Sequence, residues 1–155
     1  MILNSMSIWF DKSISLEKIK DFGRDSMAGF LGMEWTAIGD DYLQISMPIN
    51  ERTKQPYGIM HGGASCALAE TVGSVASALV IDLDKFYCVG MEINANHLRS
   101  VAHGLVTGKS TPLHLGKTTH VWDIKIYDES QNLVCVSRLT VAIIPNNKFI
   151  QHAKM

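Results

Sequence analysis

The sequence has few of the features that mark secreted, disordered or nucleic-acid-binding proteins. Among 155 residues there are three cysteines and four prolines, and 14 Lys+Arg stand against 15 Asp+Glu, for a formal net charge of -1. Cys66, Cys88 and Cys135 form no Cys-x-x-Cys pair, which argues against a disulfide framework or a zinc knuckle. Because no run of Lys and Arg is present, nucleic acid is not expected as a partner. The first residues lack a basic leader before an apolar run, so we expect a cytoplasmic protein.

The chain length predicts a single domain over residues 1–144, with a tail over residues 145–155 that begins where Pro145 interrupts an apolar pattern. Near the start, apolar residues at three-residue steps from Leu16 predict a short amphipathic helix, ended by Gly23 and the stretch Met27–Gly29. The apolar period then changes to two between Gly32 and Pro48, which predicts a β-hairpin.

A long apolar segment, Gly62–Ile81, carries a single charge, Glu70. It is long enough to span a bilayer. However, it consists mainly of Ala, Ser, Gly and Val, and its acid lies near the middle, where insertion into a membrane is costly. We therefore expect a helix that protein buries on nearly all sides, and no membrane association.

The remaining chain is rich in Val, Ile and Thr and shows the two-residue period of strands. The expected strands are Phe86–Leu98, Gly104–Pro112, Thr118–Tyr127 and Leu133–Ile144. Together with the hairpin they predict an α+β fold, in which an antiparallel sheet of about six strands wraps around the one long helix.

Glu70 is the most unusual residue of this helix, because a buried carboxylate must find partners or take up a proton. It is a functional group, a structural acid whose hydrogen bonds are satisfied in the core, or an acid on an exposed face of the helix. Ser74 lies one turn later on the same helix face and Cys66 one turn earlier.

The loop before the helix, Gln55–Gly63, ends in His61-Gly62-Gly63. Its glycines leave backbone N–H groups uncovered at the positive end of the helix dipole, which suits an oxyanion or a phosphate, although an ordinary turn has the same composition. Gly62 and Glu70 are separated by eight residues, or about 12 Å of helical rise. If both act on one carbonyl group, the helices of two subunits must lie antiparallel, which predicts at least a dimer.

Other catalytic motifs fail on inspection. The segment Gly63–Ala67 is one residue short of a Gly-x-Ser-x-Gly elbow, and the chain lacks the alternating βαβ order of the fold that uses it. His97, His103, His114 and His120 show no metal-ligand spacing, so no metal is expected. No nucleotide or redox cofactor motif is present in the sequence.

The region from Met27 to Ile144 resembles the hotdog-fold acyl-CoA thioesterases. The resemblance depends on Gln55-Pro56, on His61-Gly62-Gly63 with Glu70 downstream, and on the block Asn94–Arg99. It is closest to the bacterial branch that holds the dihydroxynaphthoyl-CoA hydrolase of menaquinone synthesis and the proofreading thioesterase of enterobactin synthesis.

This resemblance implies a catalytic role for five residues. The Gly62 N–H would hold the thioester carbonyl oxygen, Gln55 and His61 would orient it, and Glu70 of the neighbouring subunit would attack it or activate water, with Ser74 positioning the water or the carboxylate. Coenzyme A would contact a second group: Gly90, His97, Leu98, Arg99, Ser100, His114, Leu115, Gly116, Lys117, Thr118 and Thr119. Within that group, Arg99 and Lys117 are the expected phosphate contacts.

The activity implied is hydrolysis of aromatic acyl-CoA esters, with dihydroxynaphthoyl-CoA as one candidate substrate, in a dimer or homotetramer without a metal or a bound cofactor. Two alternatives stay open. One is a hotdog dehydratase that acts on hydroxyacyl thioesters. The other is a non-catalytic acyl-CoA binding module, in which Glu70 is structural.

Overall fold

The computed structural model describes residues 7–146. This part of the chain contains three helices and six strands. In chain order they are α1 (Leu16–Ile19), α2 (Met27–Phe30), β1 (Glu34–Ile38), β2 (Leu43–Pro48), α3 (Gly62–Val80), β3 (Phe86–His97), β4 (Leu105–Leu115), β5 (Thr119–Asp128) and β6 (Leu133–Pro145). The α+β prediction is confirmed. Most of the predicted tail lies outside the described residues.

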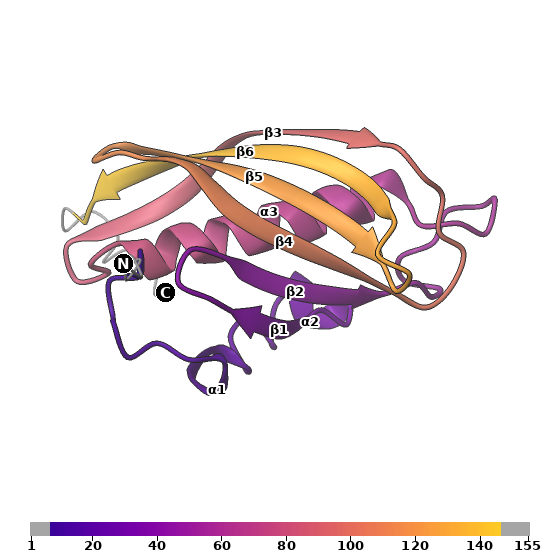
Figure 1. Cartoon of the computed structure of the whole chain (residues 1–155), viewed down its shortest axis with the longest axis horizontal. Helices are drawn as coiled ribbons and strands as arrows, with labels where there is room; N and C mark the ends of the chain where they lie inside the picture. Colours follow the sequence, from indigo (N-terminus) through magenta and orange to yellow (C-terminus); the bar gives the residue numbers. More distant parts are fainter. Residues whose placement is uncertain (1–6, 147–155) are drawn as a thin grey trace, which may run out of the picture.

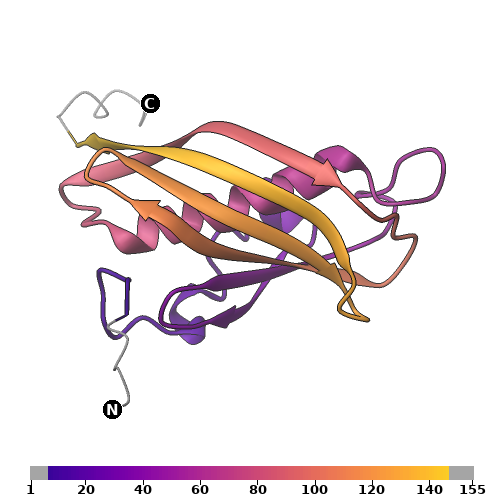
Figure 2. The ribbon, with the colours of Figure 1, turned by 45° about the horizontal axis from the view of Figure 1, so that its top comes forward.

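The six strands form one antiparallel sheet with the order β1-β2-β4-β5-β6-β3. In Figure 1 the sheet curls around α3, which runs lengthwise along its concave face, and Figure 2 shows α3 passing behind the strands. This is the hotdog arrangement that the resemblance implies, and it explains the apolar character of the helix.

Helix α3 buries one face against the sheet. Its buried residues recur at three- and four-residue steps and are Ala64, Ser65, Leu68, Ala69, Val72, Gly73, Ala76 and Ser77. Almost all the others, Glu70 included, are only partly buried. The expectation of burial on nearly all sides is therefore wrong for the single chain, because the sheet covers only one side. By length and composition α3 would pass as a membrane span, but its apolar face is used in the core.

The N-terminal segment differs from the prediction. The helix from Leu16 ends after Ile19, and the stretch Met27–Gly29, expected to end it, instead begins a second helical turn, α2. The Ser26 side chain caps this turn, since its Oγ accepts a hydrogen bond from the backbone N–H of Ala28. Capping and tertiary contacts thus select a helix in a stretch where the glycine suggested an end.

Strand β4 is longer than predicted. Pro112 has no N–H to donate and was expected to end the strand, but the strand continues to Leu115 because the register shifts between Pro112 and His114. Such a bulge accommodates the missing donor. His114 and Leu115 therefore belong to the end of a strand rather than to a loop.

Buried polar side chains tie α3 to the strand β5. Trp122 Nε1–H donates to Ser77 Oγ at 2.7 Å, and the same hydroxyl lies 3.3 Å from His120 Nδ1. Because the tryptophan nitrogen only donates, the Ser77 O–H is left to donate a hydrogen bond to His120 Nδ1. His120 is only 2% exposed, and burial lowers its pKa below the usual value of 6.5.

This histidine predicts a pH dependence of stability. Its folded-state pKa is lowered, so the unfolded chain binds more protons around pH 6, and the stabilisation is complete above pH 6.5 and is lost as the pH falls below that value. We expect the melting temperature of the wild type to fall between pH 7 and pH 5. In His120→Gln, measured by circular dichroism, this fall should be smaller. His103→Gln, at an exposed position, is the control, and an unchanged slope in His120→Gln would contradict the assignment.

Strand β3 forms one edge of the sheet, because it pairs only with β6. It is 12 residues long and exposes the apolar side chains of Val89 and Met91, which are 44% and 65% accessible. A long apolar edge strand presents unpaired backbone donors and acceptors and is a natural place for another chain to pair.

Candidate functional site

The start of α3 presents one free backbone donor. His61 is the N-cap residue, and its Nδ1 accepts a hydrogen bond from the Gly63 N–H at 2.8 Å. The N–H groups of Ala64 and Ser65 both point to the carbonyl oxygen of His61. Within residues 7–146 the Gly62 N–H has no acceptor, so at the positive end of the helix dipole this amide remains available for an anionic oxygen.

His61 has a defined tautomer in this arrangement. Since Nδ1 accepts a hydrogen bond from a backbone N–H, the neutral ring carries its proton on Nε2. The ring is exposed. The observed role of His61 is therefore that of a helix cap, and it is not among the residues that line the cavity beside Gly62.

A cavity of about 310 Å³ opens beside Gly62. Its walls come from the loop before α3, the first turns of α3 and the end of β3, and are lined by Gln55, Ile59, Met60, Gly62, Ser65, His97, Leu98, Arg99, Ser100, Val101 and Val134. The structure thus brings together Gln55, Gly62 and the block His97–Ser100, all of which were predicted as site residues.

His97 lies close to Gly62. A β-carbon at Gly62 would be only 2.9 Å from His97 Nε2. The other ring nitrogen, Nδ1, is 3.4 Å from Ser65 Oγ, which is fully buried. His97, predicted as a coenzyme A contact, thus lines the same cavity as Gly62.

Glu70 lies in the middle of α3, beside the edge strand β3 of the sheet. Ser74 Oγ donates to Glu70 Oε1 at 3.0 Å, as the one-turn spacing predicts. The carboxylate also lies against Gly90 of β3. It is half-buried rather than enclosed, and Ser74 is the partner that a carboxylate on this helix was expected to need.

Glu70 is separated from the cavity that contains Gly62. Neither Glu70 nor Ser74 lines that cavity, and Glu70 follows Gly62 by eight positions, which correspond to about 12 Å of helical rise. Both must be within about 3 Å of a reacting group to act on it. A single chain therefore does not assemble the predicted site.

Gly90, one of the predicted coenzyme A contacts, lies beside Glu70. The predicted contacts in the segment 114–119 lie at the end of α3 opposite to Gly62. There a larger cavity of about 670 Å³ is lined by Leu115, Gly116, Lys117 and Thr118, together with Phe10, Val80, Ile81, Asp82, Phe86, His120, Ile143 and Pro145. His114 and Thr119 flank this segment but do not line the cavity. Most of its lining is apolar, and its basic side chains are those of Lys117 and His120.

Two residues near the site were missed from the sequence. Sequence spacing could have identified Ser65, since it lies three residues after Gly62 and thus on the same helix face. No sequence signal identifies Cys88, because its contact with Ser74 arises only when β3 packs on α3. Its Sγ donates to the Ser74 carbonyl oxygen at 3.6 Å, and burial raises the pKa of the Cys88 thiol, which keeps it protonated.

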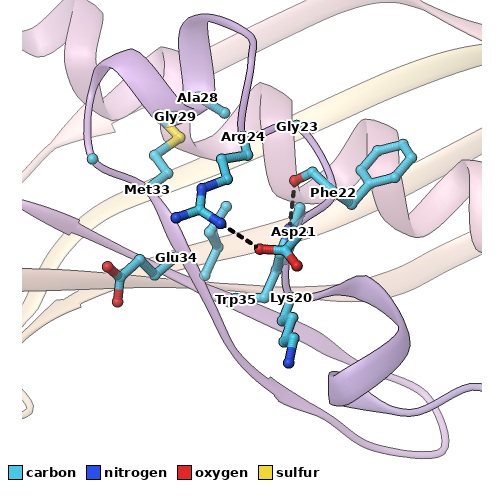
Figure 3. Close-up of a pocket in the computed structure, with 12 residues that line it drawn as sticks. Lys20, Asp21, Phe22, Gly23, Arg24, Ala28, Gly29, Met33, Glu34 and Trp35 are labelled. Carbon is cyan, nitrogen blue, oxygen red and sulfur yellow. Dashed lines mark hydrogen bonds and ion pairs between the residues drawn. The ribbon is translucent and has the colours of Figure 1, made fainter.

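A third cavity, of about 320 Å³, lies between the N-terminal segment and β1 and contains none of the predicted residues. Figure 3 shows two interactions among its lining residues: Arg24 binds Asp21 at 3.0 Å, and Trp35 Nε1 donates to the Phe22 carbonyl oxygen at 2.9 Å. In the part of the chain that the structure describes, no group of three or more His, Cys, Asp or Glu side chains is placed to hold a metal ion.

Comparisons with known proteins agree with this geometry. The family model of the Thioesterase superfamily matches residues 57–135, just over half of the chain. The chain is 50% identical to the 1,4-dihydroxy-2-naphthoyl-CoA hydrolase of Escherichia coli (strain K12) over 137 residues, which cover 88% of this chain and 99% of that protein. It is 44% identical to the proofreading thioesterase EntH of Cronobacter turicensis, with coverage of 88% and 98%.

Solved structures give the same result. The crystal structure of a mutant thioesterase from Pseudomonas aeruginosa superposes with a TM-score of 0.86 at 44% identity, covering 90% of this chain and 99% of that chain. A match of this quality extends the resemblance from the motifs around Gly62 to the whole described fold. The chain therefore belongs to the thioesterase superfamily.

Proposed function

We propose that this protein hydrolyses aromatic acyl-CoA esters to the free acid and coenzyme A, with dihydroxynaphthoyl-CoA as the first substrate to test. The observation that carries the proposal is the free Gly62 N–H beside a cavity lined by Gln55 and His97. The activity named for the E. coli relative supports the choice of a naphthoyl ester.

The chemistry follows from these groups. The thioester carbonyl oxygen accepts from the Gly62 N–H, which stabilises the negative charge that develops as the carbonyl carbon is attacked. Glu70, held by Ser74, either activates a water molecule as a general base or attacks the carbon itself to give a mixed anhydride that water then cleaves. In both routes the C–S bond breaks, the thiolate of coenzyme A leaves, and water supplies the new oxygen of the acid.

The distance between Gly62 and Glu70 supports a site that two chains form together. Two copies paired antiparallel through the β3 edges would place both α3 helices on one face of a continuous sheet, running in opposite directions. Glu70 lies against β3, the strand at that edge. We therefore propose a homodimer in which Gly62 of one chain acts with Glu70 of the other, and a homotetramer as a pair of such dimers.

The same pairing gives a place for coenzyme A. The cavity beside Gly62 and the cavity at Leu115–Thr118 lie at opposite ends of α3, so an antiparallel partner brings the second of one chain toward the first of the other. Arg99 and Lys117 then supply positive charge from the two chains for phosphate groups. The proposed reaction requires no metal or redox cofactor, and three free thiols suit the cytoplasm.

The proposal is tested by thiol release, followed with a thiol-trapping dye, from dihydroxynaphthoyl-CoA, benzoyl-CoA, hydroxyphenylacetyl-CoA and a medium-chain acyl-CoA. We expect the aromatic esters to be hydrolysed faster than the aliphatic one. Binding of the esters without thiol release would favour the binding module, and an enoyl product from a hydroxyacyl ester would favour the dehydratase.

A further inference from the structure

Gly90 on β3 faces the Glu70 carboxylate. A β-carbon at Gly90 would lie 2.1 Å from Glu70 Oε1, 3.0 Å from its Cδ and 3.3 Å from Oε2. All three nearest atoms thus belong to the same carboxylate. Ordinary contacts between non-bonded atoms are near 3.5 Å, so a methyl group and the present carboxylate cannot occupy this place together.

The backbone of Gly90 does not itself require glycine. The described glycines with a positive φ are Gly23, Gly32, Gly58 and Gly104, and Gly90 is not among them. Alanine can therefore adopt the same conformation without backbone strain. The absent side chain matters only because of the space that it leaves for Glu70.

We infer that Gly90 is a positioning residue for Glu70: it forms the wall against which the carboxylate rests, and Ser74 holds the carboxylate from the helix. This inference rests on the proposed function and deepens it, because it assigns to Gly90 a role in catalysis rather than the coenzyme A contact that family resemblance implies. A methyl group at Gly90 pushes Oε1 away by more than about 1 Å. A misplacement of this size costs a rate on the order of 100-fold.

Two other glycines provide comparisons: alanine is expected to disturb the core at Gly73 and to be tolerated at Gly108. A β-carbon at Gly73 would lie 2.6 Å from Leu139 Cδ2, inside the core, so alanine there disturbs packing. At Gly108 of β4 the nearest atom, Leu68 Cγ, is at 3.3 Å, which a small adjustment accommodates. At Gly90 the atoms that must move are the end of a flexible, half-exposed side chain, so the fold is expected to tolerate alanine.

The test compares Gly90→Ala with the matched control Gly108→Ala and with the wild type. We expect kcat of Gly90→Ala to fall about 100-fold, with KM and melting temperature close to those of the wild type, and Gly108→Ala to keep most of its activity. Full kcat in Gly90→Ala would overturn the inference. So would a large fall in melting temperature or loss of folded protein, as expected for Gly73→Ala, because Gly90 would then be structural.

A binding measurement separates positioning from substrate contact. A non-hydrolysable thioether analogue of the ester is titrated calorimetrically into Glu70→Gln with and without Gly90→Ala. Equal affinities support the positioning role, whereas weaker binding in the double variant would make Gly90 a substrate contact and overturn it. An inactive wild type, or an active Glu70→Ala, would instead refute the proposed function and is seen independently of the Gly90 result.

Discussion

Glu70→Gln is expected to lower kcat for thioester hydrolysis by about 10²–10⁴-fold, the contribution typical of a positioned acid or base. Glutamine keeps the length and shape of the side chain and can still accept from Ser74 Oγ, which now binds Oε1 at 3.0 Å. It cannot take a proton from water or form an anhydride with the acyl group. The loss should therefore appear in kcat, with the melting temperature nearly unchanged because the side chain is half-exposed.

The matched control is Glu34→Gln, which removes an exposed carboxylate from β1. Steady-state rates of thiol release and thermal melts of both variants provide the comparison. If Glu70→Gln retains activity within tenfold of the wild type, Glu70 is neither nucleophile nor base, and the carboxylate beside Gly90 is a structural group.

Co-expression of two inactive variants is expected to restore activity. In a heterodimer of Glu70→Gln with Gly62→Val, one site receives intact Gly62 from the first chain and intact Glu70 from the second, and the other site receives both substitutions. An isolated heterodimer should therefore have about half of the wild-type activity, as two-fold symmetry requires. Each homodimer should be inactive, because each of its sites has one defect.

The heterodimer is isolated with two different affinity tags, and its thiol release is compared with that of each parent. A heterodimer as inactive as its parents would mean that Gly62 and Glu70 act within one chain, in conflict with their separation of about 12 Å along α3. The control for exchange of subunits is a chain that carries both Glu70→Gln and Gly62→Val, mixed with the wild type.

Periodicity predicted most of the fold because each element has one apolar side that must face the core. The hairpin, α3 and the last four strands begin and end within three residues of their predicted bounds. Periodicity did not predict the elements that depend on single contacts. These are the second helical turn, which Ser26 caps, and the extension of β4 past Pro112.

The candidate site was predictable where its residues are neighbours in sequence. Ser74 binds Glu70 because one helical turn separates them, and His61 caps α3 because it directly precedes the first turn. Contacts between α3 and β3 join residues that are far apart in sequence, so sequence spacing does not predict them. The sequence therefore did not show that His97 lies close to Gly62 or that Gly90 faces Glu70. These contacts arise only from the register of the sheet.

The position of β3 in the chain has a consequence for how the protein is made. Strand β3 directly follows α3, yet its only partner among the described strands is β6, the last one, and Gly90 pairs with Val141. During translation, Glu70 and Gly90 therefore leave the ribosome well before the strand that fixes β3 in place. Until β6 emerges, β3 has two unpaired edges, and a stalled or truncated chain exposes them to other nascent chains. The Glu70 carboxylate can therefore pack against Gly90 in its final position only when the last strand of the domain has been synthesised.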